Sequence, residues 1–286
     1  TVSLSGGPQT VVLGKTGAAV LPTVTITDSD SNVLTGAKVK VTAAPALIPV
    51  HIAGDTFNFA SQNGISIVSN SAGVLTLTGN ATVAHYKAAL ESITFSATQV
   101  IDGLLGGTVS RKLTVTVTDE LGLTSDAKTG TARVVRPTAP SVSVSGATPT
   151  YTVGKAGVVV LPTVTIADSE SMTLTKATVT VRKDDFLFSD VVSGDKLNFS
   201  DQNGITGSYN TNTGVLTLTG TASLANYTTA LQSVTFTATQ VIDGLISGTV
   251  GRTITLTVTD ETNLTSDSFS ASVNVVRSVA PTVSLS

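Results

Sequence analysis

Acidic side chains are the residues of this chain whose types and spacing could do chemistry. Residues 1–140 contain eight of them, and seven of the eight positions carry an acid again 140 or 141 residues later. Other surface charges have drifted more, since Lys38 and Lys87 both become threonine and Arg133 becomes Asn274. Carboxylate oxygens that cluster in a fold are the ligands that Ca²⁺ prefers. The retained pairs are Asp28/Asp168, Asp30/Glu170, Asp55/Asp195, Asp102/Asp243, Asp119/Asp260, Glu120/Glu261 and Asp126/Asp267.

The spacing of the acids reflects a duplication of the whole segment. The sequence QNGI of residues 62–65 returns at 202–205, and TVSLS of residues 1–5 returns at 282–286. A period this long is several times that of a solenoid unit, so each copy is large enough to own a core and to fold alone. We therefore predict one β-sandwich repeat at residues 1–140, a second at 141–281, and the start of a truncated third repeat at 282–286.

Within each copy, the hydrophobic pattern predicts strands. Leucine and valine alternate with threonine in residues 113–118 and 75–78, which is typical of half-buried strands with one polar face. Residues 81–90 differ, because Tyr86 and Leu90 lie four residues apart after a threonine, which predicts one short capped helix. Seven or eight strands in about 140 residues predict an all-β fold of two tandem Ig-like Greek-key sandwiches, each with one short helix.

Composition limits the class of protein further. Of the 286 residues, 41% are hydrophobic and 12% are charged, and the net charge is −3. A chain without a basic surface cannot hold a phosphate backbone, so we expect no nucleic-acid partner. The absence of cysteine excludes disulfides and thiolate chemistry. No apolar run approaches the length of a membrane span, so we expect no membrane contact by this segment.

Several stretches resemble the cadherin-like and Ig-like tandem repeats of large bacterial surface adhesins. They are VTITDSDSNVLTGAKVKV at 24–41, GVLTLTGNATVAHYKAALESITF at 73–95 and LTVTVTDELGLTS at 113–125, and the resemblance covers essentially all of both copies. Its most specific part is the middle stretch. The resemblance implies an extracellular extender that holds a distal binding domain away from the cell, often with calcium at the repeat junctions.

The resemblance also directs attention to one pole of each sandwich. In an Ig-like fold, the loop after the second major strand and the last hairpin lie at the end where the chain enters. These loops carry four acids per copy, and four crowded carboxylates repel one another unless a cation joins them. In cadherins, the matching Asp-x-Asp and strand-F aspartate are calcium ligands. The predicted calcium ligands are Asp28, Asp30, Asp119 and Glu120, and Asp168, Glu170, Asp260 and Glu261.

Two other interpretations of these acids stay open. A cadherin linker carries its own Asp/Asn cluster, whereas the linker here reads VRPTAP at 135–140 and carries Arg136. Arg136, which recurs as Arg277, could supply the counter-charge itself through a bidentate pair with the acids of the next copy. Alternatively, the acids are turn formers, because Asp and Ser in such loops bond their own backbone.

A second acid position is predicted to be an ion pair. Asp102 lies in VIDGL, in the loop before the strand that begins near Arg111, and Asp243 stands in the same relation to Arg252. Both halves of this pair recur in the second copy. In each copy, we expect this Asp–Arg pair at the pole opposite the four predicted calcium ligands.

Enzyme chemistry finds no support. The two histidines, His51 and His85, become Val191 and Asn226, so neither belongs to a reaction that both copies perform. No phosphate loop, zinc helix or nucleophile elbow is present. Glycan binding normally needs exposed aromatic platforms, and the chain has no Trp and four Tyr.

The sequence therefore predicts extender repeats of a bacterial cell-surface or secreted adhesin, with no enzyme activity. Pro137, Pro140 and Pro281 are expected to stiffen the junctions, because proline fixes φ and restricts the residue before it. The expected partners are neighbouring repeats of the same chain, the segment itself is expected to be a monomer, and other domains would engage host-surface protein or glycan. The alternative is a ligand-binding adhesion module for glycan or protein.

Overall fold

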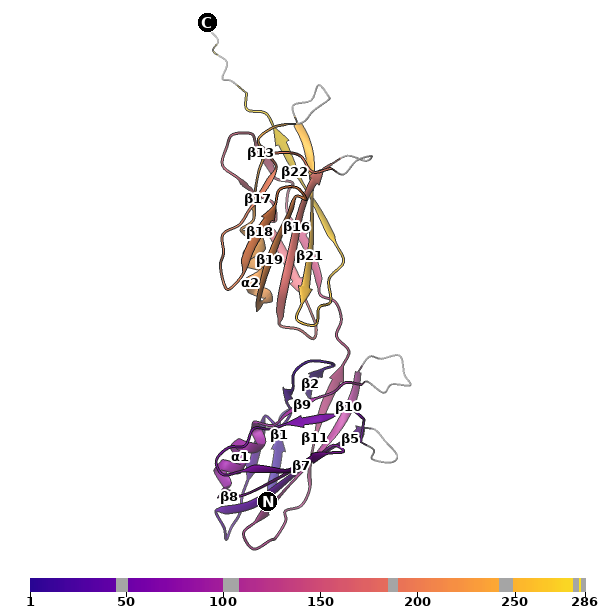
Figure 1. Cartoon of the computed structure of the whole chain (residues 1–286), viewed down its shortest axis with the longest axis vertical. Coiled ribbons are helices and arrows are strands. Elements are labelled where there is room, and N and C mark those ends of the chain that lie inside the picture. The colour runs from indigo at the N-terminus through magenta and orange to yellow at the C-terminus, as the bar shows by residue number, and fades with distance from the viewer. Residues whose placement is uncertain (45–50, 100–107, 185–189, 242–248, 280–282, 284–286) are drawn as a thin grey trace. The chain divides into compact units, whose positions relative to one another are not determined.

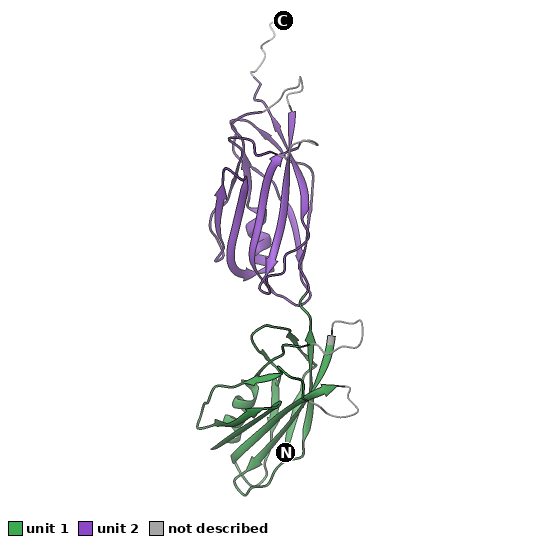
Figure 2. Cartoon of the chain, turned by 45° about the vertical axis from the view of Figure 1, so that its right-hand side comes forward, with its two compact units in different colours: residues 1–137 green, residues 138–286 purple. Residues whose placement is uncertain are grey.

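A computed structural model shows the chain as two compact units, residues 1–137 and residues 138–286 (Figure 2). The border between them lies close to the start of the second copy. Within each unit, the same elements follow one another in the same order. The structure describes residues 1–44, 51–99, 108–184, 190–241, 249–279 and 283. The predicted third-copy strand at 282–286 therefore lies almost entirely outside the described residues.

The larger layer of unit 1 is a six-stranded sheet in the order β2-β11-β10-β5-β8-β7. All of its neighbours are antiparallel except β2 and β11, which pair in parallel. The central strand β5 pairs with β8 and β10 and not with its sequence neighbours, which is the long-range pairing of a Greek key. The strands are β2 (Gln9–Val12), β5 (Val33–Ala44), β7 (Ser66–Ser71), β8 (Val74–Thr82), β10 (Thr108–Asp119) and β11 (Lys128–Val135).

Among the described residues of unit 1, the smaller strands form two further sheets, and the remaining element is a single helix (Figure 1). One sheet is the pair β1-β4, and the other has the order β3-β9-β6. The first strands therefore switch sheets, because β1 pairs with β4 while β2 joins the larger layer. The elements are β1 (Val2–Ser5), β3 (Ala18–Ala19), β4 (Thr23–Ile26), β6 (Thr56–Asn58), α1 (Val83–Glu91) and β9 (Thr94–Ser96).

Unit 2 repeats this arrangement. Its sheets have the orders β13-β22-β21-β16-β19-β18, β12-β15 and β14-β20-β17, and β13 pairs with β22 in parallel. The elements are β12 (Ser141–Ser145), β13 (Thr150–Thr152), β14 (Val158–Val159), β15 (Thr163–Ala167), β16 (Thr173–Lys183), β17 (Lys196–Asn198), β18 (Thr206–Asn210), β19 (Val215–Ser223), α2 (Leu224–Gln232), β20 (Thr235–Thr237), β21 (Thr249–Asp260) and β22 (Phe269–Val276).

Alternation in the sequence decides which side chains form the core. Along β10, Leu113 and Val115 are fully buried, while Thr114 and Thr116, which alternate with them, are half-buried. Each unit has its own cluster of buried hydrophobic residues, one within residues 2–134 and the other within 151–275. The predicted all-β fold of two Ig-like sandwiches is confirmed.

The predicted helix is also confirmed in both copies. Thr82 caps α1 by accepting a hydrogen bond from the backbone N–H of His85, and Ser223 caps α2 in the same way. Tyr86 and Leu90 are buried against the core. The Tyr86 hydroxyl donates to the carbonyl of Gly79 at 2.8 Å, so the helix is tied to the end of β8. Each helix has nine residues, and no helix in the described part of the chain is long and apolar enough to cross a membrane.

A tight turn packs against that strand end. Asn63 and Gly64 both have positive φ, and Gln62 and Ile65 exchange two backbone hydrogen bonds around them, as in a type I′ turn. The turn lies so close to β8 that a Cβ on Gly79 would stand 2.0 Å from the Gly64 carbonyl oxygen. Gly79 itself has a φ of 143°, so both its backbone and its surroundings require glycine.

Candidate functional site

The structure brings the four predicted acids of unit 1 together at the ends of β4 and β10. Hydrogen bonding to Asp28 and the negative charge of Asp28 raise the pKa of Asp30, and the charge of Asp119 adds to the effect. Glu120 belongs to the same group, because its Oε1 accepts a hydrogen bond from Ser31 Oγ at 3.0 Å. The loop after β4 and the last hairpin thus meet at one pole of the unit.

The matching acids of unit 2 form the same group and are more deeply placed. Burial raises the pKa of Asp168, and the charges of Asp260 and Glu170 raise it further, against hydrogen bonds from two backbone N–H groups. Glu261 accepts a hydrogen bond from Ser171 Oγ. The pKa of Glu170 is lowered, because hydrogen bonds from Ser169 and Thr138 outweigh the opposing effect of burial.

One oxygen of each central aspartate organises a turn. Asp119 Oδ1 accepts the backbone N–H groups of Leu121 and Leu123, both at 2.8 Å. Asp260 Oδ1 accepts the matching N–H groups of Thr262 at 2.7 Å and Leu264 at 3.0 Å. These bonds hold the hairpin in shape, as expected for a carboxylate that folds its own backbone. The structure therefore directly shows the turn-forming role that the sequence left as one of three alternatives.

In unit 2, two carboxylates of the acidic group each have one oxygen without a hydrogen-bond partner among the described residues. Among the residues that the structure describes, Asp168 Oδ2 and Asp260 Oδ2 are buried and have no hydrogen-bond partner. Asp260 is only 1% exposed. A buried carboxylate oxygen without a partner is costly and attracts either a proton or a cation. These two atoms are the part of the site whose chemistry is unsatisfied.

The acids do not form a complete metal centre. Within the described ranges, no three His, Cys, Asp or Glu side chains stand in a group that could hold a metal ion. Calcium needs six to eight oxygens, and the two orphaned atoms supply only two of them. The remaining ligands would have to come from carbonyls, water or side chains that change rotamer.

Each unit also contains a fully buried ion pair. Arg111 Nε donates to Asp55 Oδ2 at 2.6 Å, and neither side chain is exposed at all. The Arg111 guanidinium donates a further hydrogen bond to the Gln99 carbonyl at 2.9 Å. Burial raises the pKa of Asp55, and the ion pair with Arg111 opposes that rise. In unit 2, Arg252 Nε and Asp195 Oδ2 repeat the contact at 2.5 Å.

The sequence predicted a different partner for each arginine, and that prediction stays untested. Asp102 and Asp243 lie outside the described residues, and the described carboxylate partners of the arginines are Asp55 and Asp195. These aspartates precede the short strands β6 and β17, far from the arginines in sequence. The available signal in the sequence is that both the aspartates and the arginines are retained in the second copy.

Comparisons with known proteins identify no relative by sequence. No protein-family model matches the chain, and no curated protein matches it. Solved structures that are similar include the fibronectin(III)-like modules of Clostridium thermocellum CbhA, with 12% identity, 97% of this chain and 95% of that chain covered, and a TM-score of 0.26. The C-terminal domain of the Streptococcus pyogenes antigen I/II-family protein AspA matches with 12% identity, coverages of 85% and 84%, and a TM-score of 0.27.

A third similar structure is the protocadherin gammaB7 EC3-6 cis-dimer, with 14% identity, coverages of 97% and 50%, and a TM-score of 0.26. Whole-chain scores this low carry no argument about function. The class of the protein rests instead on its own strands: each unit is an all-β, Ig-like sandwich with one short helix.

Proposed function

We propose that the chain is a pair of tandem extender repeats from a large bacterial surface or secreted adhesin, which space a distal binding domain from the cell. The observation that carries the proposal is that each copy has its own hydrophobic core, and that among the described residues the two core clusters have no member in common. A module with its own core adds length when it is repeated and does not depend on its neighbour for folding.

The surface of the modules fits such a role. Strand faces that point to solvent carry threonine, as between the buried residues of β10 and β21. Threonine suits a pleated surface and keeps it polar without charge. Pro137 and Pro140 restrict the backbone where one copy passes into the next. The proposed module therefore has no catalytic task, and neighbouring repeats are its proposed partners.

Separate expression tests the proposal. Residues 1–140 and residues 141–286 are each expected to give a cooperative unfolding transition at the temperature of the matching transition in the full chain. The reason is that, in the described part of the chain, each core cluster contains residues of its own unit alone. If either half failed to fold by itself, or unfolded far below its transition in the full chain, the two copies would be one cooperative structure and the extender proposal would fail.

We further propose that calcium stiffens the acidic pole. The support is the pair of orphaned oxygens, Asp168 Oδ2 and Asp260 Oδ2, in a group of four acids that recurs in both units. A cation there would satisfy both atoms and relieve the repulsion between them. Calcium would then stabilise the folded state by mass action.

Thermal unfolding of the full chain in calcium and in chelator tests this part separately. We expect the unit 2 transition to rise in calcium, and we expect Asp260→Asn to abolish the rise. Magnesium at the same concentration is the control for ionic strength. Superimposable curves in calcium and chelator would remove calcium from the account and leave the turn-forming role of the acids.

A further inference from the structure

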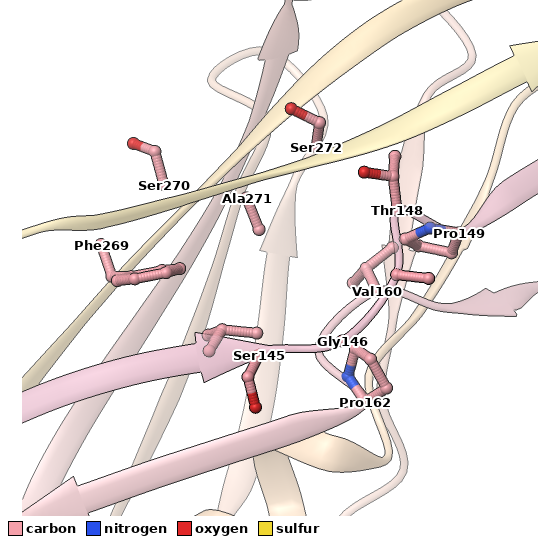
Figure 3. A pocket seen from close by; sticks show the side chains of 12 residues that line it. Ser145, Gly146, Thr148, Pro149, Val160, Pro162, Phe269, Ser270, Ala271 and Ser272 are labelled. Carbon is pink, nitrogen blue, oxygen red and sulfur yellow. The ribbon is translucent and has the colours of Figure 1, made fainter.

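The strongest unassigned feature is a hollow in unit 2 between the first and last strands. Its volume is about 190 Å³, and it lies where the chain leaves β12 at Gly146 and passes beside β22. Figure 3 shows residues 269–272 along β22 on one side, with Ser145, Gly146 and Pro162 on the other. A second hollow lies against the preceding residues of the same two segments, residues 139–142 on one side and Thr265, Asp267 and Ser268 on the other. The two form a long seam, which we call the β12–β22 seam.

The backbone of β22 is open along this seam. β13 covers only the end of β22, at Asn274–Val276, where the N–H of Asn274 donates to the Pro149 carbonyl at 2.9 Å. In an antiparallel pair, every second residue directs its N–H and C=O away from the partner strand. Ser272 and Ser270 therefore face the same edge as Asn274, and the described part of the chain offers their backbone groups no partner. Such an edge accepts a further strand.

The floor of the hollow is apolar and small. Val144, Val160 and Ala271 contribute to it, and none of the described residues that line it carries a charge. The volume is below the about 300 Å³ at which pockets for small molecules begin. It suits an aliphatic side chain or two. Together, the open edge and the hollow match the two requirements of strand addition, which are main-chain hydrogen bonds and pockets for alternate side chains.

Unit 1 provides an internal comparison. The equivalent hollow, between Ser5, Pro22 and Thr131, has a volume of only about 50 Å³. Leu4 stands where unit 2 has the smaller Val144, and a Cβ on Gly130 would lie 3.5 Å from Leu4 Cδ1. The leucine side chain thus covers the floor of this hollow. The last strand has an open backbone edge in both copies, but the hollow beside that edge is larger in unit 2 than in unit 1.

We propose that the β12–β22 seam of unit 2 binds an extended, uncharged polypeptide segment by strand addition to Ser270–Ser272, with one valine-sized side chain in the hollow. Unit 1 does not bind such a segment, because Leu4 fills the space. This function is separate from spacing, since it would give one of two repeats a recognition role that the other lacks.

The test is a titration of the full, isotope-labelled chain with the capped peptide Ac-Thr-Val-Thr-Val-Thr-NH₂, followed by amide NMR shifts. We expect shifts at Ser270, Ala271 and Ser272 and none at Thr129–Thr131, with a dissociation constant of about 1 mM or tighter. Ac-Thr-Val-Pro-Val-Thr-NH₂ is the control peptide, since its proline removes a donor. Its binding is expected to be weaker by at least about fivefold, the effect of one lost hydrogen bond.

Two variants locate the site. Val144→Leu fills the hollow and is expected to weaken binding by at least about fivefold, as overpacking does. Leu4→Val, the matched change in unit 1, is expected to leave binding in unit 2 unchanged. Should Val144→Leu disturb the fold, Phe269→Lys, which places the unit 1 residue at the mouth of the hollow, is expected to have the same effect on binding.

Three results would overturn the proposal. They are no localised shifts at about 5 mM peptide, equal shifts in both units, or full binding by Val144→Leu and Phe269→Lys. Methyl glycosides are titrated in parallel. Shifts at Ser270–Ser272 with a glycoside and not with the peptide would assign the seam to sugar and would equally refute the proposed strand addition.

Discussion

The buried ion pair gives the sharpest prediction about what holds each unit together. In Asp55→Ala, the Arg111 guanidinium stays fully buried and keeps one described acceptor, the Gln99 carbonyl at 2.9 Å. Removing one partner of a buried pair costs about 3–5 kcal/mol, because the remaining charge has no compensation. For a unit of 137 residues, that loss lowers Tm by roughly 10–18 °C.

Differential scanning calorimetry of the full chain measures the effect with a control in the same molecule. Only the transition of unit 1 is expected to move, because unit 2 has its own pair, Arg252 with Asp195. The double variant Asp55→Leu/Arg111→Met removes both charges and is expected to recover most of the loss. A fall of less than about 1 kcal/mol in Asp55→Ala would refute the reasoning, since it would mean that water reaches the arginine.

Three further predictions concern single positions. Asp168→Asn is expected to stabilise unit 2 at pH 7 by about 1 kcal/mol, the scale of one hydrogen bond, since an amide replaces a buried oxygen without a partner near Asp260. Because the pKa of Asp168 is raised on folding, its wild-type contribution is present at low pH and is lost as pH rises through the folded pKa, so the variant should show a flatter pH profile of Tm. Gly79→Ala is expected to destabilise unit 1 by more than about 2 kcal/mol in urea unfolding, because its Cβ would overlap the Gly64 carbonyl and its φ is positive. Thr82→Ala is expected to cost about 1 kcal/mol in the same assay through loss of the α1 cap, whereas Thr82→Ser should be nearly neutral.

The elements were predictable from the sequence because their signals are local. The alternation of residues 113–118 alone decides which face of β10 is buried, and the cap and spacing around Tyr86 define α1. The grouping of the acids at one pole was predictable for a different reason. It follows from the topology of the sandwich, which places the loop after β4 beside the last hairpin.

The partner of Arg111 was not predictable in this way. Asp55 lies 56 residues from Arg111 in the sequence, and no periodicity links a residue before a short strand to a residue near the start of a long one. The contact of Asp55 with Arg111 depends on how these two segments pack against each other, which is a tertiary property. The hollow beside Val144 is similar, because its volume depends on which side chain covers a gap between strands that belong to different sheets.

Small-angle scattering tests the central claim most directly, since the claim is that two self-sufficient modules provide reach. The radius of gyration of the full chain is compared with that of residues 141–286 alone. Two modules held in line are expected to raise it to nearly twice the single-module value. A single globule of double the length would raise it by only about 30%, and a ratio near that value would contradict the account.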